Sequence, residues 1–136
     1  MEKVIKLSIY TPYGKYLVTE CDYLSLTTGM GVIGVLPNHA PLISNVEICK
    51  ITIKKDSVNS LYATSGGIIN IKKDHSVTLL LNSIERSDEI DVNRAQAAKK
   101  RAETLLSETN NKEIDIARAK ASLLRALNRL DVSDNN

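Results

Sequence analysis

The side chains with the clearest chemical potential in this sequence are its arginines. All six lie after position 85, whereas all five tyrosines lie before position 63. Arg94 and Arg101 are seven residues apart, so on a helix they share one face. Arg118 and Arg125 repeat this spacing, and Arg129 lies one helical turn beyond Arg125. The pattern predicts two arginine-bearing helical faces in the C-terminal part of the chain.

A fold-back at Asn110-Asn111 would bring these two faces together. Position 94 would then fall near position 127, and position 101 near position 120, so that the five arginines converge. Converging guanidinium groups repel one another unless an anion lies between them, and their planar forks match phosphate oxygens. The spacing therefore favours a polyphosphate ligand. A solvated basic face, or a surface for an acidic partner, is the alternative interpretation of the same residues.

Residues 91–131 are predicted to form the two helices that carry these arginines. Neither glycine nor proline occurs from position 68 onward. Asp91 is the expected N-cap of the first helix, and Asn110 with Glu113 resembles a capping box that opens the second. Apolar residues recur at helical spacing: Val92, Ala95, Ala98, Ala102, Leu105 and Leu106 in the first helix, and Ile114, Ala117, Ala121, Leu124 and Leu127 in the second.

An internal repeat supports an antiparallel hairpin of these helices. Residues 90–106 align with residues 114–130 at a shift of 24 positions. The break between the helices, at residues 109–111, is short, which favours antiparallel neighbours. The seam would be rich in alanine, and each buried methyl group contributes only about 0.8 kcal/mol. We therefore expect a close-fitting but weak hairpin that can open or detach.

Residues 1–84 are predicted to form a β-sandwich or barrel of short antiparallel strands. Their apolar runs are short, rich in β-branched residues and bounded by Gly, Pro, Asn, Asp or Ser. The expected strands are 4–10, 16–23, 32–36, 46–53, 61–63, 68–71 and 77–81. The predicted fold class is therefore α+β, with a β-sandwich domain at 1–84 followed by a helical hairpin domain at 85–136.

Several classes of function lack their motifs in this sequence. There is no G-x-x-x-x-G-K-[ST] loop and no G-x-S-x-G elbow, so we expect no catalytic residues and no ATP hydrolysis by the chain alone. Gly29, Gly31 and Gly34 fit the spacing of a dinucleotide fingerprint, but no helical pattern follows them. Cys21 and Cys49 stand apart and are expected to be buried thiols; with only two histidines besides, no metal site is expected.

Charge and hydropathy restrict the partners. A net charge of +2 is too small to indicate the strongly basic surface that binds nucleic acid, so no nucleic-acid partner is expected. No apolar run approaches the roughly 20 residues that span a bilayer. The N-terminus alternates instead of showing a signal peptide's apolar run, so we expect an unprocessed cytosolic protein.

The stretch GMGVIGVLPNHAPLIS at 29–44 combines three glycines, two prolines and a histidine. Pro37 ends an apolar strand because proline has no ladder donor, and Pro41 extends the segment that follows. His39 has no acidic or cysteine neighbour in the sequence. We interpret it as a histidine that fixes the loop, with a subunit contact through His39, Pro37 and Pro41 as the functional alternative.

This stretch resembles the signature of the epsilon subunit of F-type ATP synthases, and the similarity runs along the whole chain. The core G-x-x-G-x-L-P-x-H-A-P lies at 31–41, and residues 9–14 are similar to the family's N-terminal I-x-T-P-x-G. The resemblance implies a non-catalytic central-stalk subunit that couples rotation between F1 and the membrane rotor. Its implied partners are the gamma subunit, the rotor c-ring and, when the hairpin is extended, the alpha and beta catalytic subunits. The implied location is peripheral, on the cytoplasmic face of the bacterial cell membrane and touching it only through the complex.

The resemblance also implies an ATP site and a regulatory switch. Some bacterial members bind ATP in the folded hairpin through an I/L-D-x-x-R-A motif, and residues 90–95 match it in full. Residues 114–119 fit it as a second copy, but the first copy adjoins the β domain and is favoured. The folded, ATP-bound hairpin would permit hydrolysis and the extended hairpin would inhibit it. The implied ATP-binding residues are Glu85, Ile90, Asp91, Arg94, Ala95, Arg101, Arg125 and Arg129.

Within this set, Glu85 and Asp91 are assigned to polar groups of adenine or ribose, and the arginines to phosphates. ATP is expected as a regulatory ligand; no cofactor is required, and nothing in the sequence assigns a role to Mg²⁺. Two other functions fit part of the pattern. One is a free-standing ATP-binding sensor, which would not copurify with gamma. The other is an interaction protein that uses its basic helices, whose binding would fall steeply with salt if the partner were a nucleic acid.

Overall fold

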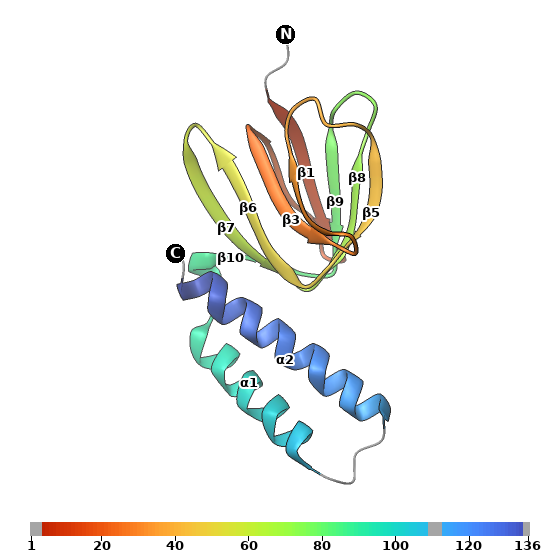
Figure 1. The fold of residues 1–136 in the computed structure, drawn as a ribbon. Coiled ribbons are helices and arrows are strands. Elements are labelled where there is room, and N and C mark those ends of the chain that lie inside the picture. Colours follow the sequence, from red (N-terminus) through yellow and green to blue (C-terminus); the bar gives the residue numbers. More distant parts are fainter. Residues whose placement is uncertain (1–3, 109–112, 135–136) are drawn as a thin grey trace.

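A computed structural model of the chain describes residues 4–108 and 113–134. Figure 1 shows two β-sheets packed face to face, with a pair of antiparallel helices beneath one end of the sandwich. The predicted fold class, a β-sandwich followed by a two-helix hairpin, is confirmed.

In the described residues, ten strands form two five-stranded sheets. The first sheet has the order β2-β1-β9-β8-β5, and the second has the order β10-β7-β6-β3-β4. Strand β1 pairs with β9 in parallel and with β2 in antiparallel orientation. The strands are β1 (Ile5–Thr11), β2 (Gly14–Cys21), β3 (Tyr23–Thr28), β4 (Gly31–Val35), β5 (Leu42–Val46), β6 (Cys49–Lys55), β7 (Val58–Thr64), β8 (Gly67–Ile71), β9 (Val77–Leu81) and β10 (Ile84–Arg86).

Alternating burial along the strands builds the core between the sheets. In β1, Ile5, Leu7 and Ile9 are fully buried, while Lys6 between them is exposed. Successive side chains of a strand point to opposite faces, so every second residue enters the core. The core is filled by Ile, Leu and Val, with Tyr62 as its aromatic member. Burial of these aliphatic side chains is the main favourable contribution to folding.

The predicted strand 16–23 matches β2 over residues 16–21, but its end is wrong, because the chain changes sheets there. Strand β2 lies in the first sheet and β3 in the second, and Asp22 forms the corner between them. The backbone N–H of Asp22 donates to the carbonyl of Lys54 at 2.7 Å, and its carboxylate accepts from the backbone N–H of Asp56 at 3.0 Å. These long-range bonds place the corner, and the local pattern of residues does not contain them.

The predicted strand 46–53 matches β6 over residues 49–53, but its start is wrong for the same reason. Strand β5 ends at Val46 in the first sheet, and β6 begins at Cys49 in the second. Between them the backbone N–H of Glu47 donates to the carbonyl of Thr27 at 2.9 Å. The apolar pattern is the same before and after the chain passes from one sheet to the other, so the pattern alone does not show where one strand ends and the next begins. The predictions placed no strand at 24–28 or 42–45, where β3 and β5 lie, and none at β10, which pairs with β7.

Two helices follow the sandwich, α1 (Val92–Ser107) and α2 (Glu113–Asp134). Asp91 caps α1 as predicted, because its carboxylate accepts a hydrogen bond from the backbone N–H of Arg94 at 3.1 Å. The predicted break at residues 109–111 and the capping box of Asn110 with Glu113 lie outside the described residues. An alanine-rich seam is present, with buried alanines at equivalent positions of the repeat: Ala95 and Ala102 in α1, and Ala119 and Ala126 in α2. The predicted apolar face of the second helix is wrong, because Ala117, Leu124 and Leu127 are exposed and the helix turns its Ala119–Ala126 face to the seam instead.

Both cysteines are free and buried, as predicted. Burial raises the pKa of the Cys21 thiol from 9.0 to about 11, and it also raises the pKa of Cys49. Because the thiolate is the reactive form, we expect neither thiol of the folded protein to react with a disulfide reagent at pH 8. Both should react at once in urea. A fast reaction of the folded protein would contradict this prediction.

The same pKa shift makes stability depend on alkaline pH. The unfolded chain gives up the Cys21 proton near pH 9, whereas the folded protein holds it to about pH 11. The stability contributed by the neutral thiol is therefore fully present below pH 9 and is lost as the pH rises from 9 to 11.

Candidate functional site

An ion pair joins the last strand of the sandwich to the second helix. Glu85 in β10 points away from the core, because its neighbour Ile84 is buried on the opposite face. The Arg129 Nη2 donates to Glu85 Oε2 at 3.2 Å, and Arg129 Nε lies 2.7 Å from Oε1. The side chains of Arg129 and Glu85 are 25% and 33% exposed, so solvent reaches the pair from one side.

A small pocket surrounds this ion pair. Its volume is about 30 Å³, which is room for about one water molecule. It is lined by Ala63, Thr64, Ser65, Ser83, Glu85, Arg125 and Arg129. The structure therefore brings together three of the predicted ATP-binding residues: Glu85, Arg125 and Arg129.

The hydroxyl groups of this pocket were missed by sequence reasoning. Ser65 Oγ and Ser83 Oγ lie 2.6 Å apart, and Thr64 Oγ1 donates to the carbonyl of Ser83 at 2.7 Å. Arg125 is exposed, and its Nη2 donates to Ser122 Oγ at 3.1 Å. The pocket thus offers two guanidinium groups and several hydroxyls beside one carboxylate, which is a chemistry suited to an anion.

The other predicted ATP-binding residues lie at the start of α1 and along it. Ile90 is buried in a small cluster with Ala63 and Val132. Asp91 serves as the helix cap, and Ala95 is buried. Arg94 and Arg101 are exposed and do not line the pocket of Arg125 and Arg129. The predicted ATP-binding residues are therefore divided between the pocket at β10 and α2 and the N-terminal part of α1.

Helix α2 docks on the sandwich through residues that sequence reasoning also missed. The Asn128 amide donates to the carbonyl of Cys49 at 2.7 Å and lies 3.5 Å from that of Thr64. Val132 is fully buried in the cluster with Ala63 and Ile90. An asparagine within a helix has poor helix propensity, and this was the available signal for Asn128.

The linker between the sandwich and α1 is also fixed by side chains. It forms a short 3₁₀ turn, η1 (Ser87–Glu89), in which the Glu89 carboxylate accepts from the Tyr16 hydroxyl at 2.8 Å. The Tyr16 ring packs edge-on against Tyr62. Burial and the neighbouring Glu89 carboxylate raise the pKa of Tyr16 far above its ordinary value, so this hydroxyl stays protonated. Arg86 and Asp88 form a second, exposed ion pair at 2.6 Å.

The loop between β4 and β5 holds the histidine of the sequence signature. The backbone N–H of His39 donates to the carbonyl of Leu36 at 3.0 Å. Its Nδ1 lies 2.6 Å from the carbonyl of Ala40, and the carbonyl can only accept, so Nδ1 carries the proton. Both contacts lie within the loop, as expected of a loop-fixing histidine, and the subunit contact through His39 stays a prediction. Pro37 is partly buried and Pro41 is exposed in the same loop.

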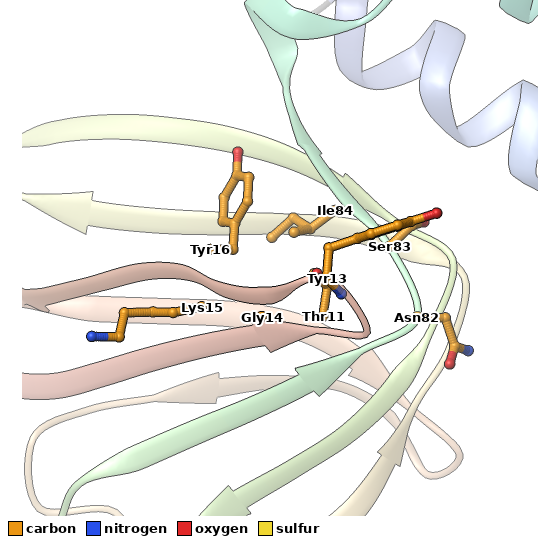
Figure 2. Close-up of a pocket in the computed structure, with 8 residues that line it drawn as sticks. All are labelled: Thr11, Tyr13, Gly14, Lys15, Tyr16, Asn82, Ser83 and Ile84. Carbon is orange, nitrogen blue, oxygen red and sulfur yellow. Dashed lines mark hydrogen bonds between the residues drawn. The ribbon is translucent and has the colours of Figure 1, made fainter.

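Two larger hollows lie at the end of the sandwich where β1 turns into β2. Figure 2 shows the first, of about 290 Å³, between the hairpin of Tyr13 and Lys15 and the facing segment of Asn82 and Ser83. The second, of about 420 Å³, is an open groove on the outer face of the first sheet. It is lined by Tyr10, Thr11, Pro12, Gly67, Ile68, Leu80, Leu81 and Asn82.

This outer face carries an apolar row. Ile68 and Leu80 are paired across β8 and β9, and Leu80 lies beside Tyr10 of β1. Ile43 on β5 is 73% exposed, and Ile68 and Leu80 are about half exposed. Apolar side chains exposed together on one face make this face a candidate contact surface.

In the described residues, no group of three or more His, Cys, Asp or Glu side chains could hold a metal ion. None of the described helices has the length and apolar character needed to cross a bilayer. The fold and site define the class of protein: a ten-stranded β-sandwich with a helical hairpin packed against it at one small polar pocket.

Comparisons with known proteins identify the family. The ATP synthase delta/epsilon chain models match, with the beta-sandwich domain at residues 4–87 and the long alpha-helix domain at 88–134. The chain is 40% identical over 131 residues to the ATP synthase epsilon chain of Bacillus licheniformis, covering 96% of this chain and 98% of that one. It is 38% identical over 133 residues to that of Geotalea daltonii, covering 98% and 96%.

Solved structures share the fold. A chain of the Euglena gracilis mitochondrial ATP synthase (OSCP, F1 and c-ring) aligns with a TM-score of 0.80 at 17% identity, covering 91% of this chain and 78% of that one. A chain of the Tetrahymena thermophila mitochondrial ATP synthase central stalk and c-ring aligns with a TM-score of 0.65 at 12% identity, covering 97% of each.

The chain therefore belongs to the delta/epsilon chain family of F-type ATP synthases, the non-catalytic subunits of the central stalk. The predicted family and the prediction that the chain is not itself an enzyme are both confirmed. The two family models meet between residues 87 and 88, close to the predicted boundary between 84 and 85. Strand β10 extends the second sheet to Arg86.

Proposed function

We propose that this chain couples rotation between F1 and the membrane rotor, and that its hairpin binds ATP and inhibits ATP hydrolysis when extended. The observation that carries the proposal is the pocket of Glu85, Arg125 and Arg129, where the hairpin meets the sandwich. A ligand bound there touches both parts of the protein at once. It can therefore distinguish a docked hairpin from an extended one.

The ATP proposal assigns roles by charge. Arg125 and Arg129 bind phosphate oxygens, and Arg94 and Arg101 approach the same phosphates from α1 when the ligand is present. Glu85 and Asp91 bind polar groups of adenine or ribose, beside Ile90 and Ala95. ATP shifts the hairpin toward its folded state only by its differential affinity for the two states. The extended hairpin is then the form that meets the catalytic alpha and beta subunits.

The outer face of the first sheet is the proposed contact with the gamma subunit. Its apolar row of Tyr10, Ile68 and Leu80 lies along an open groove. The loop of Pro37, His39 and Pro41 connects the two edge strands β4 and β5 and is assigned to subunit contact as well. The c-ring is the second partner of the sandwich, and the location is the cytoplasmic face of the cell membrane, through the complex alone.

Titration of ATP into the full-length chain by calorimetry tests the ATP proposal, with ADP as the ligand control and with and without Mg²⁺. We expect wild-type binding and a loss of at least tenfold in Arg94→Ala, since a hydrogen bond to a charged group contributes about 1.5–3 kcal/mol. Arg118→Ala is the matched variant, because Arg118 is also exposed but is not among the ATP-binding residues that the family resemblance implies. It should bind like the wild type.

Two results would contradict this proposal. Equal losses in Arg94→Ala and Arg118→Ala would mean that only overall charge matters. An absence of wild-type binding would reassign the arginines to a partner surface and leave the stalk function in place. Copurification with gamma separates the stalk function from a free-standing ATP sensor.

A further inference from the structure

The hydrogen bonds and the ion pair that join the described part of the hairpin to the two sheets come from one short segment of α2. Asn128 donates to the carbonyls of Cys49 and Thr64, Arg129 pairs with Glu85, and Val132 is buried against Ala63. Figure 1 shows α2 beneath the strands and α1 on its far side. The docked position of the hairpin therefore depends on residues 128–132.

Of these contacts, the ion pair is the one that an anion can replace. The Asn128 bonds end on backbone carbonyls, and Val132 is fully buried. The Glu85–Arg129 pair is partly open to solvent. Its bonding is also incomplete, because the buried Arg129 Nε lies close to the carboxylate without an aligned hydrogen bond. The same guanidinium fork also matches phosphate oxygens, so an anion that displaced Glu85 would meet the same donors.

The pocket leaves no room for that anion while Glu85 is in place. A volume of about 30 Å³ holds about one water molecule and no phosphate chain. A phosphate can reach Arg129 only if the carboxylate of Glu85 moves away. Both groups are anions that accept from the same guanidinium fork, so they exclude each other.

We propose that Glu85 is an internal substitute for phosphate. In the nucleotide-free protein its carboxylate holds Arg129 and latches the hairpin to β10. A phosphate chain takes over Arg129 and releases Glu85, while Asn128 and Val132 keep α2 in place during the exchange. The replacement of Glu85 by phosphate on Arg129 rests on the proposed ATP function, whereas the latch does not. The latch adds stability to the docked hairpin when no nucleotide is bound, and it lowers the apparent affinity for phosphate.

A charge swap tests the latch without any nucleotide. Hydrogen exchange of residues 126–132 is measured in the full-length chain and its variants. We expect exchange to rise at least fivefold in Glu85→Gln and in Arg129→Glu. The double variant Glu85→Arg/Arg129→Glu should return to within twofold of the wild type. Glu103→Gln, which removes an exposed carboxylate of α1, is the matched control and should not change. Unchanged exchange in the single variants, or a double variant no better than they are, would overturn the latch.

Binding of inorganic tripolyphosphate tests whether phosphate replaces Glu85 on Arg129, because this ligand carries the phosphate chain without a base. We expect Glu85→Gln to bind it at least fivefold more tightly than the wild type, and Glu103→Gln to bind it like the wild type. The charge-swapped variant should not bind it. Equal or weaker binding of tripolyphosphate by Glu85→Gln would overturn the proposal that phosphate replaces Glu85 on Arg129. A rescued double variant together with no ATP binding by the wild type would support the latch and count against the ATP proposal alone.

Discussion

Replacing Ile68 or Leu80 by glutamate should weaken binding to the gamma subunit by at least 100-fold and leave the fold intact. Both side chains lie on the outer face of the first sheet and are 47% and 51% exposed, so neither contributes to the core. They are direct neighbours across β8 and β9 and line the same groove. A central apolar residue of an interface contributes about 2–4 kcal/mol, and a buried unpaired carboxylate adds a further penalty.

Calorimetry with purified gamma gives the affinity, and circular dichroism confirms that each variant is folded. Val58→Glu is the matched control. Val58 is also apolar and 64% exposed, but it lies on β7 of the opposite sheet. It should bind gamma like the wild type. Full affinity in both Ile68→Glu and Leu80→Glu would exclude this face as the contact surface.

Gly67→Ala should destabilise the sandwich by more than about 3 kcal/mol, a large part of the 5–15 kcal/mol typical of a domain. Gly67 has a φ of +156°, and a Cβ there would lie 2.1 Å from the carbonyl oxygen of Leu80 and 2.8 Å from the Cα of Leu81. These are backbone atoms of the neighbouring strand, so they cannot turn aside as a side chain could. Relief of the clash requires β8 and β9 to separate.

Urea unfolding followed by circular dichroism measures this loss. Gly14→Ala is the matched control, since Gly14 has a φ of +112° but no atom within 4 Å of the place that an added methyl group would occupy. It should lose only about 1–2 kcal/mol, the cost of left-handed backbone for an alanine. Similar losses in the two variants would show that backbone conformation, and not the contact with Leu80, limits position 67.

The thiol and ATP predictions address the two parts of the chain separately. The thiols report on the closed core of the sandwich, whereas Arg94→Ala reports on the hairpin. Because the hairpin meets the sheets through residues 128–132, a variant that undocks it should leave the thiols protected. The sandwich and the hairpin can thus be tested as two units of one chain.

Short-range patterns in the sequence determined the class of fold and much of the helical part. Alternation of apolar residues predicted a β-sandwich, and helical spacing with the internal repeat predicted the hairpin and its alanine seam. Asp91 was recognised as a cap because a cap needs only the next three residues. The family signature at 31–41 needed no structure either. In each case the signal is a pattern of residues that can be recognised within the sequence alone.

The tertiary structure decided the features that depend on distant parts of the chain. The corner at Asp22 rests on a bond to residue 54, and the Asn128 bond to Cys49 spans 79 positions. The Glu85–Arg129 pair spans 44 positions. The sequence contained both residues but could not show that they bind each other in the absence of a ligand. The energy of such contacts depends on how the sheets and helices pack, and no local pattern of residues records that packing.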